Sequence, residues 1–414
     1  MAVINGERLF RDVFYNLCLI LVGSKLGFIG KLISREKEGV TMRQPFWTTL
    51  TILSALFVVP QFATAQNLTP QQMSRLLKRF PQVDRDGDGK LSPEEIAPLR
   101  ERLEKAKKRK EQGLTPTQTK PKGPAPTHAD LQYGDHENAV MDVWIADAEK
   151  PTPIVVAIHG GGFKSGDKSR FHGCAELQAC LKNGVSFASI NYRFRDEDPR
   201  GILACLHDSK RAIQFIRHQA KEWNIDKERV AAFGRSAGAG TTLWLACHDD
   251  MADPNSTDPV QRESSRVVAG GLMGTQATYD VLQWKELLPL KQPWTPEIEK
   301  RREPDILVAY GVQSLDELNS EKGKAIRKER DMLAWMSADD PPIWMKNTMR
   351  GGPIAMNDQN HFNHHPAHVA CLKKRADEVG MQTVAIAPSV GLKPNPEMSM
   401  IDFLFEHLGL DPSR

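Results

Sequence analysis

One serine in this chain stands where its chemistry could be that of a nucleophile. It is Ser236, in the pattern Gly-x-Ser-x-Gly at residues 234–238. The apolar residues 230–233 predict a buried strand, and residues 241–247 predict a helix, so the pattern falls on a sharp strand-to-helix turn. Small flanking residues suit the strained backbone of such a turn, and the helix N-terminus offers free amides to a negative charge. The alternative interpretation is an ordinary Gly/Ser-rich turn before a helix.

A second glycine run strengthens the first interpretation. The apolar residues 153–158 predict a buried strand that leads directly into His-Gly-Gly-Gly at residues 159–162. Glycine amides without side chains in the way are what an oxyanion hole requires. The spacing between the two motifs leaves room for two strand–helix units. We therefore predict that Ser236 attacks a carbonyl carbon, and that the amides of Gly161, Gly162 and Ala237 hold the resulting oxyanion.

These motifs carry a resemblance to a known family. The segment from about Gln132 to Leu410 resembles the secreted esterase and lipase branch of the α/β-hydrolases, near the hormone-sensitive-lipase-like and acetyl-xylan/feruloyl esterase-like members. Besides the two glycine motifs, the matching residues are Asn191-Tyr192-Arg193, Asp208 with Ala212 and Ile216, and Asp340-Pro341-Pro342. The resemblance implies an α/β-hydrolase fold and a serine enzyme that cleaves carboxylic or carbohydrate esters without a cofactor.

The apolar patterns independently predict alternating strands and helices, which indicates an α/β fold with a mostly parallel sheet and helices on both faces. An alternating segment at 139–145 is expected as an antiparallel edge strand. Further strands are predicted at 154–158, 186–191, 230–233, 267–272, 343–345 and 383–387, and helices at 174–183, 202–223 and 401–408. A helical insertion near 276–338 lies where this fold usually builds a lid.

The general base is the difficult part of the assignment. In this fold the catalytic histidine follows the last core strand, yet the loop after 383–387 contains no histidine. His407 lies within the final predicted helix. Four of the 12 histidines instead gather in residues 357–368. We assign Asp358 as the orienting acid and His361 as the base.

Other interpretations of this histidine-rich segment stay open. His364 or His365 could replace His361 as the base, and clustered imidazoles also suit zinc or copper. A solvated polar loop is the third possibility. Without a working base, the domain would be a binding scaffold with a hydrolase fold. Arg235, beside the serine, could hold an anionic substrate group or lie on the surface.

A calcium loop precedes the hydrolase-like segment. Residues 84–95 match the EF-hand pattern at every position that supplies a ligand or the sharp turn. The expected Ca²⁺ ligands are Asp84, Asp86, Asp88, the Lys90 carbonyl and a bidentate Glu95. The alternative is an acidic solvated turn. Only one such loop is visible, so its affinity could be modest.

The N-terminal residues predict export. Residues 42–65 read as a basic start, an apolar run and an Ala63-Thr64-Ala65 cleavage site, which is typical of a signal peptide rather than of a membrane anchor. Residues 1–41 would then be an extension from an upstream start. We expect periplasmic or extracellular protein beginning at Gln66, with no lasting membrane span.

The remaining organisation follows from composition and charge. A calcium-binding unit at 66–112 and a Pro/Thr/Lys linker at 113–130 are expected before the hydrolase domain at 131–414. The net charge is +3, and residues 1–65 hold all of it, so no basic surface for nucleic acid is predicted. The expected partner is a small-molecule or polysaccharide ester.

Overall fold

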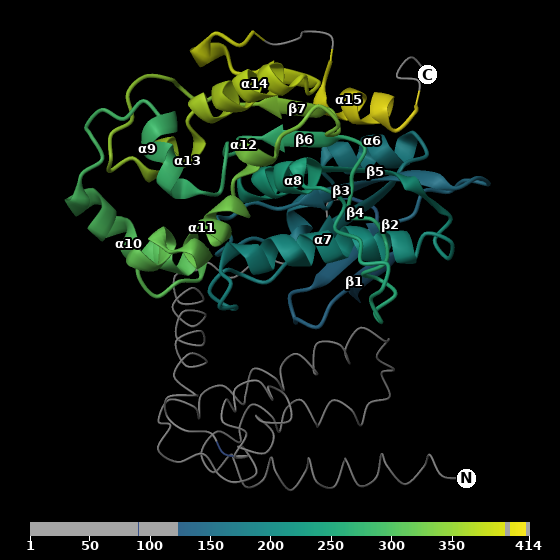
Figure 1. Cartoon of the computed structure of the whole chain (residues 1–414). Coiled ribbons are helices and arrows are strands. Elements are labelled where there is room, and N and C mark those ends of the chain that lie inside the picture. The colour runs from purple at the N-terminus through teal and green to yellow at the C-terminus, as the bar shows by residue number, and fades with distance from the viewer. Residues whose placement is uncertain (1–89, 91–122, 394–397, 411–414) are drawn as a thin grey trace, which may run out of the picture. The chain divides into compact units, whose positions relative to one another are not determined.

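The computed structural model describes Lys90, residues 123–393 and residues 398–410 (Figure 1). The chain divides into two compact units, Met1–Thr117 and Gln118–Arg414, and nearly all described residues belong to the second. The predicted signal peptide and calcium-binding unit lie outside the described residues, except for Lys90.

The second unit is built on one mixed sheet of eight strands in the order β1-β2-β4-β3-β5-β6-β7-β8. β1 and β2 pair antiparallel with their neighbours, and every pairing from β4 through β8 is parallel. The strands are β1 His128–Gln132, β2 Val140–Trp144, β3 Thr152–Ile158, β4 Ser186–Ile190, β5 Ile225–Arg235, β6 Gly270–Met273, β7 Ile343–Lys346 and β8 Thr383–Ile386. This order is that of the α/β-hydrolase fold, which confirms the predicted fold class.

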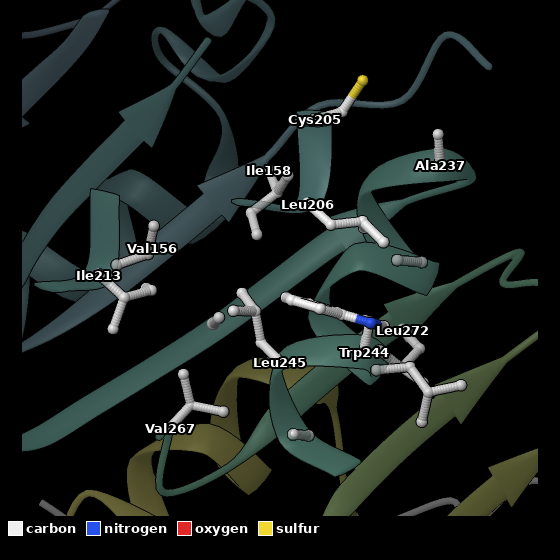
Figure 2. Close-up of a cluster of buried hydrophobic side chains, with 14 of the residues drawn as sticks. Val156, Ile158, Cys205, Leu206, Ile213, Ala237, Trp244, Leu245, Val267 and Leu272 are labelled. Atoms are coloured by element: carbon white, nitrogen blue, oxygen red, sulfur yellow. The ribbon is translucent and has the colours of Figure 1, made fainter. Parts of the chain in front are cut away.

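Helices cover both faces of this sheet because its central strands are apolar throughout. In β3 the alternate residues Val156 and Ile158 belong to one core, while Val155 and Ala157 belong to the other. The helices outside the insertion are α6 Ala175–Lys182, α7 Ile202–His218, α8 Ala237–Cys247, α13 Gln359–His364, α14 Ala367–Val379 and α15 Met400–His407. α7 and α8 contribute to the first core (Figure 2), as does α14, whereas α6 and α15 contribute to the second.

Four helices lie between β6 and β7, in the region of the predicted insertion. These are α9 Trp284–Leu287, α10 Pro296–Tyr310, α11 Glu321–Lys328 and α12 Met332–Trp335, with 3₁₀ turns η5 Val281–Gln283 and η6 Asp316–Asn319. α9 and α10 lie beside α13 at one end of the domain (Figure 1). A buried carboxylate, Asp280, accepts hydrogen bonds from Tyr310 and Arg327 and so ties this insertion together. No helix in the described ranges is long and apolar enough to cross a membrane.

Four local predictions need correction. The edge of the sheet is β1, so the segment around β2 is not an edge strand, and the last residues of the predicted linker belong to β1. The long helix α7 ends at His218 instead of Trp223. The histidine-rich segment is not a loop: residues 359–364 form α13, because Asp358 caps that helix by accepting a hydrogen bond from the His361 amide at 2.9 Å.

Candidate active site

The serine turn has the strain that the sequence predicts. Ser236 has φ 54° and is one of four non-glycine residues with positive φ in the described ranges. It sits between the end of β5 and the start of α8. A Cβ at Gly234 would lie 2.2 Å from the Gly238 carbonyl carbon, and a Cβ at Gly238 would lie 2.0 Å from the Ile158 carbonyl oxygen. Both glycines are therefore required by close backbone approach rather than by flexibility.

The glycine run after β3 packs directly against this turn. A Cβ at Gly160 would lie 2.4 Å from the Arg235 carbonyl oxygen, so the two segments touch through backbone atoms. Gly162 and Ala237 line a cavity of about 250 Å³ together with Ser236. Neither amide has a hydrogen-bond acceptor within the described ranges. Gly161 is not in the cavity wall; its carbonyl accepts from the Lys164 amide at 3.1 Å and closes the turn.

His159 packs against Tyr192 behind the glycine run, and among the described residues it forms no hydrogen bond with Ser236. Its ring stacks on Tyr192 at 4.4 Å, and the Tyr192 hydroxyl donates to the His159 carbonyl at 2.7 Å. Burial lowers the pKa of His159 to about 4, so its ring stays neutral.

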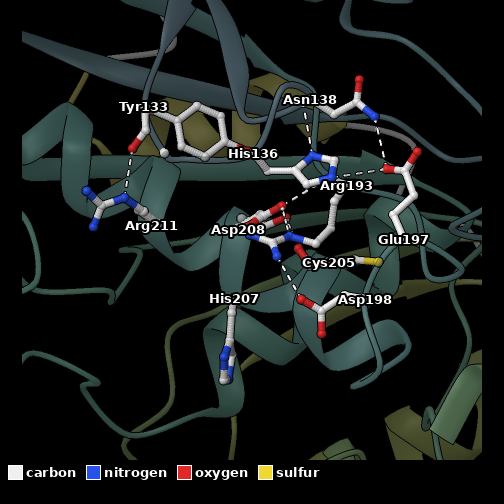
Figure 3. A network of polar contacts seen from close by, with 12 residues as sticks. Tyr133, His136, Asn138, Arg193, Glu197, Asp198, Cys205, His207, Asp208 and Arg211 are labelled. Carbon is white, nitrogen blue, oxygen red and sulfur yellow. Dashed lines mark hydrogen bonds and ion pairs between the residues drawn. The ribbon is translucent and has the colours of Figure 1, made fainter. Parts of the chain in front are cut away.

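Ion pairs of Arg193, the residue after Tyr192, hold the chain segment that follows β4 in place. Figure 3 shows Arg193 between Asp208 of α7 and Asp198. The guanidinium donates to both Asp208 oxygens at 2.8 and 2.7 Å, and to Asp198 at 2.8 Å. Asp208, which carries part of the family resemblance, holds the segment on α7. The same segment reaches the glycine run, because the Arg195 amide donates to the Phe163 carbonyl at 2.8 Å.

The histidine in contact with the serine is His364. Its Nε2 lies 2.7 Å from Ser236 Oγ, within hydrogen-bond distance. Its Nδ1 faces two oxygens of Asn360, the carbonyl and the side-chain Oδ1, both at 3.2 Å. If Nδ1 carries the proton and donates to these oxygens, Nε2 is free to accept the serine proton. This arrangement can activate Ser236.

The ends of two strands anchor the His364 segment. Asn347, directly after β7, donates to the His364 carbonyl at 2.9 Å. Gln276, after β6, donates to the Asn363 carbonyl at 2.8 Å. His364 therefore reaches Ser236 from a helix between β7 and β8, although the usual position after the last strand has no histidine. No sequence pattern distinguished His364 from the other histidines of this segment. The only available signal was its position at the end of a helix capped by Asp358.

Desolvation lowers the pKa of His364 below its ordinary value of 6.5, and the hydrogen bond with Asn360 opposes that shift. A neutral imidazole at neutral pH is the form that can accept a proton. No Asp or Glu in the described ranges contacts the His364 ring. The orienting group on Nδ1 is thus Asn360, not a carboxylate.

The predicted pair Asp358 and His361 does not meet at the serine. Asp358 uses one oxygen to cap α13 and the other to pair with Arg350 at 2.7 Å. The His361 ring is buried and its Nε2 contacts the Arg350 carbonyl at 3.0 Å. Both therefore shape the segment, and the prediction that His361 meets the serine is wrong: His364 is the histidine that contacts Ser236. The physical reason is that Asp358 and His361 lie at the start of α13, whereas His364 ends it.

The other two histidines of the segment, His365 and His368, form hydrogen bonds with backbone groups. His365 bonds the Gly352 carbonyl through Nε2 and accepts from the Ala367 amide through Nδ1. His368 accepts from the Ala277 amide, and burial lowers its pKa to about 3. Within the described residues, no group of three or more His, Cys, Asp or Glu side chains could hold a metal ion. The zinc or copper alternative therefore has no support in this segment.

Arg235 lies on the surface, where its side chain is exposed and pairs with Glu176 at 3.2 Å. It does not line the cavity at Ser236. The second of its two predicted locations is therefore the one observed.

Parts of this segment are similar to known esterases and lipases. The BD-FAE family matches residues 141–320, which cover the serine turn, the glycine run and much of the insertion. Esterase LipI of Mycobacterium tuberculosis is 29% identical over 103 residues, 25% of this chain and 31% of that protein. Carboxylesterase NlhH of the same organism is 31% identical over 94 residues, 23% of this chain and 28% of that protein.

Other likenesses are partial. Lipase 1 of Geotrichum candidum is 31% identical over 101 residues, 21% of this chain and 17% of that lipase. The chain thus spans less than a third of the length of these curated relatives. A truncated carbohydrate esterase from gut microbiota shares 16% identity with a TM-score of 0.49, covering 70% of this chain and 99% of that structure.

Proposed function

We propose that this chain is an exported serine hydrolase that cleaves carboxylic esters of small molecules or carbohydrates. The observation that carries the proposal is the 2.7 Å contact between Ser236 Oγ and His364 Nε2 at the wall of a cavity. The esterase and lipase names of the matched relatives agree with this reaction.

In the proposed reaction, His364 Nε2 takes the Ser236 proton as Oγ attacks the ester carbonyl carbon. The amides of Gly162 and Ala237 donate to the oxyanion, and the Gly161 carbonyl closes the turn that presents Gly162. The imidazolium then protonates the leaving alcohol, and an acyl group remains on Ser236. A water molecule, deprotonated by His364, releases the acid and restores the serine.

A weaker second candidate is a binding scaffold with little turnover. It is favoured by one observation, the amide of Asn360 in place of a carboxylate at His364 Nδ1. A carboxylate would stabilise the imidazolium that forms during attack, and a neutral amide does so less well. The two candidates predict the same cavity but different chemistry.

Hydrolysis of p-nitrophenyl acetate by the full chain and by Ser236→Ala separates these candidates. The esterase proposal expects turnover that Ser236→Ala reduces by a factor on the order of 10⁴ or more. Ser209→Ala, which removes a buried hydroxyl of α7 that donates to the Cys205 carbonyl, is not in the cavity wall and serves as the matched control. If the wild type turns the ester over no faster than Ser236→Ala does, the esterase proposal is refuted and the binding scaffold is supported.

We also propose that residues 84–95 bind one Ca²⁺ ion through the ligands expected of an EF-hand loop. These residues lie outside the described ranges, apart from Lys90. Calorimetry on the full chain should show one calcium site that is weakened at least about tenfold in Glu95→Gln, because the bidentate carboxylate is lost. No heat of calcium binding by the wild type would refute the site.

Export is proposed from the sequence of residues 42–65. Mass spectrometry of the native N-terminus should find Gln66 as the first residue. A mature chain that retains residues 42–65 would contradict cleavage at that position.

A further inference from the structure

The cavity beside Ser236 has more positive than negative charge. Four of its lining residues are charged: Lys164, Arg195 and Arg302 are cations, and Asp305 is the single carboxylate. Asp305 accepts from both Lys164 and Arg195 at 2.7 Å. One carboxylate therefore serves two cations, and the cavity wall has a surplus of two positive charges.

Arg302 is the cation of this cavity that pairs with no carboxylate of the described residues. It lies three residues before Asp305 in α10, so both side chains share one face of that helix. Its guanidinium lies over the Phe362 ring at 4.1 Å and near Trp294 at 5.5 Å. Among the residues that the structure describes, none forms a hydrogen bond or ion pair with it, and its Nε is buried without an acceptor.

Stacking on aromatic rings does not satisfy this guanidinium. A ring face attracts the charge, but the N–H donors lie in the guanidinium plane and point away from the ring. Burial lowers the pKa of Arg302, which reflects the cost of holding this charge out of water. Arg195 adds a second donor, because its Nε is also buried without an acceptor in the described ranges.

These donors are held in place rather than free to turn to solvent. The Arg195 side chain is fixed by Asp305, and its backbone by the Phe163 carbonyl next to the glycine run. Arg302 is fixed by the rings of Trp294 and Phe362, and Phe362 itself belongs to α13, the helix that carries the base. Planar guanidinium donors in a fixed position suit a planar carboxylate.

We propose that the esters cleaved at Ser236 carry an anionic group, with a carboxylate as the simplest case, which binds Arg302 and Arg195. This inference rests on the proposed esterase activity and names a substrate class for it. The carboxylate could belong to the acyl part or to the alcohol part of the ester, and the chemistry of recognition is the same in both.

Two pairs of esters test the proposal on the full chain. The mono-p-nitrophenyl ester of adipic acid and p-nitrophenyl hexanoate differ by a carboxylate at the end of the acyl chain. 4-Acetoxybenzoate and 4-acetoxybenzamide differ by a carboxylate on the alcohol. The quantity measured is the ratio of kcat/KM for the charged ester to that for the neutral ester within each pair.

Arg302→Met keeps an unbranched stem over Phe362 but removes the charge, so it should lower this ratio about tenfold in at least one pair. Arg302→Lys restores a charge and should recover part of the ratio. Arg301→Gln, an exposed neighbour on α10, is the matched control and should leave the ratio unchanged.

The outcomes separate the two proposals. Hydrolysis of both pairs with an equal ratio in the wild type and Arg302→Met would overturn anion recognition alone. The absence of any Ser236-dependent hydrolysis would overturn the esterase proposal, and anion recognition with it.

Discussion

The two halves of the candidate site differ in how they are built. The serine half consists of backbone: a positive φ at Ser236, close contacts at Gly234 and Gly238, and free amides at Gly162 and Ala237. The histidine half consists of side chains at the end of a short helix, held by Asn347 and Gln276. Backbone geometry restricts which residues are possible, whereas a side chain can reach the same point from several segments.

This difference explains which parts of the site could be predicted. Gly234 and Gly238 admit no larger residue, so the pattern around Ser236 was informative. The position of His364 depends on where α13 ends and on bonds from Asn347 and Gln276, which are distant in sequence. A local sequence pattern does not show which distant residues will hydrogen-bond to the segment that carries His364.

The largest effect is expected where backbone segments touch. Gly238→Ala would place a Cβ 2.0 Å from the Ile158 carbonyl oxygen, so β3 and α8 must separate. We expect a loss of about 3 kcal/mol or more in the free energy of unfolding, with esterase activity at background. Denaturant unfolding and turnover measure both.

Gly184→Ala is the matched control for that change. Gly184 has φ +69° but nothing within 4 Å of an added Cβ. It should cost only about 1 kcal/mol, which is the backbone strain alone. Equal losses for the two variants would mean that close packing is not what the serine turn requires.

The protonation of His364 should determine how kcat/KM depends on pH. Because desolvation lowers the pKa of His364, its neutral form persists to lower pH than that of an exposed histidine. We expect kcat/KM to rise with pH and reach half its plateau below pH 6.5, falling about tenfold per pH unit further down. A midpoint at or above 6.5, with the protein still folded at each pH, would show that another group titrates.

The fold itself was largely predictable, and its misses have local causes. The central strands were found because their apolar runs are continuous, and the two motifs set their order. β1 was missed because its residues are mostly exposed, so no apolar pattern marks them. The helix α13 was missed because it is six residues long and depends on its cap at Asp358.

The smallest effect on activity is expected at Asp358, the acid chosen from sequence. Asp358→Asn keeps an oxygen that can cap α13 and loses only an ion pair with the exposed Arg350, so kcat/KM should stay within about twofold of the wild type. Asp358→Ala removes the cap and should cost about 1 kcal/mol of stability. A hundredfold loss of activity in Asp358→Asn would instead return Asp358 to the role of orienting acid.

The rate at which a fluorophosphonate probe labels Ser236 tests the central claim, that His364 is the base. The comparison is between wild type, His364→Gln and His361→Gln, each with its thermal unfolding measured. Gln at position 361 can still donate to the Arg350 carbonyl, as His361 Nε2 is placed to do, so that variant should fold and label like the wild type. His364→Gln should label slower by a factor on the order of 10³ or more. Labelling of His364→Gln at the wild-type rate, with loss in His361→Gln, would contradict the account.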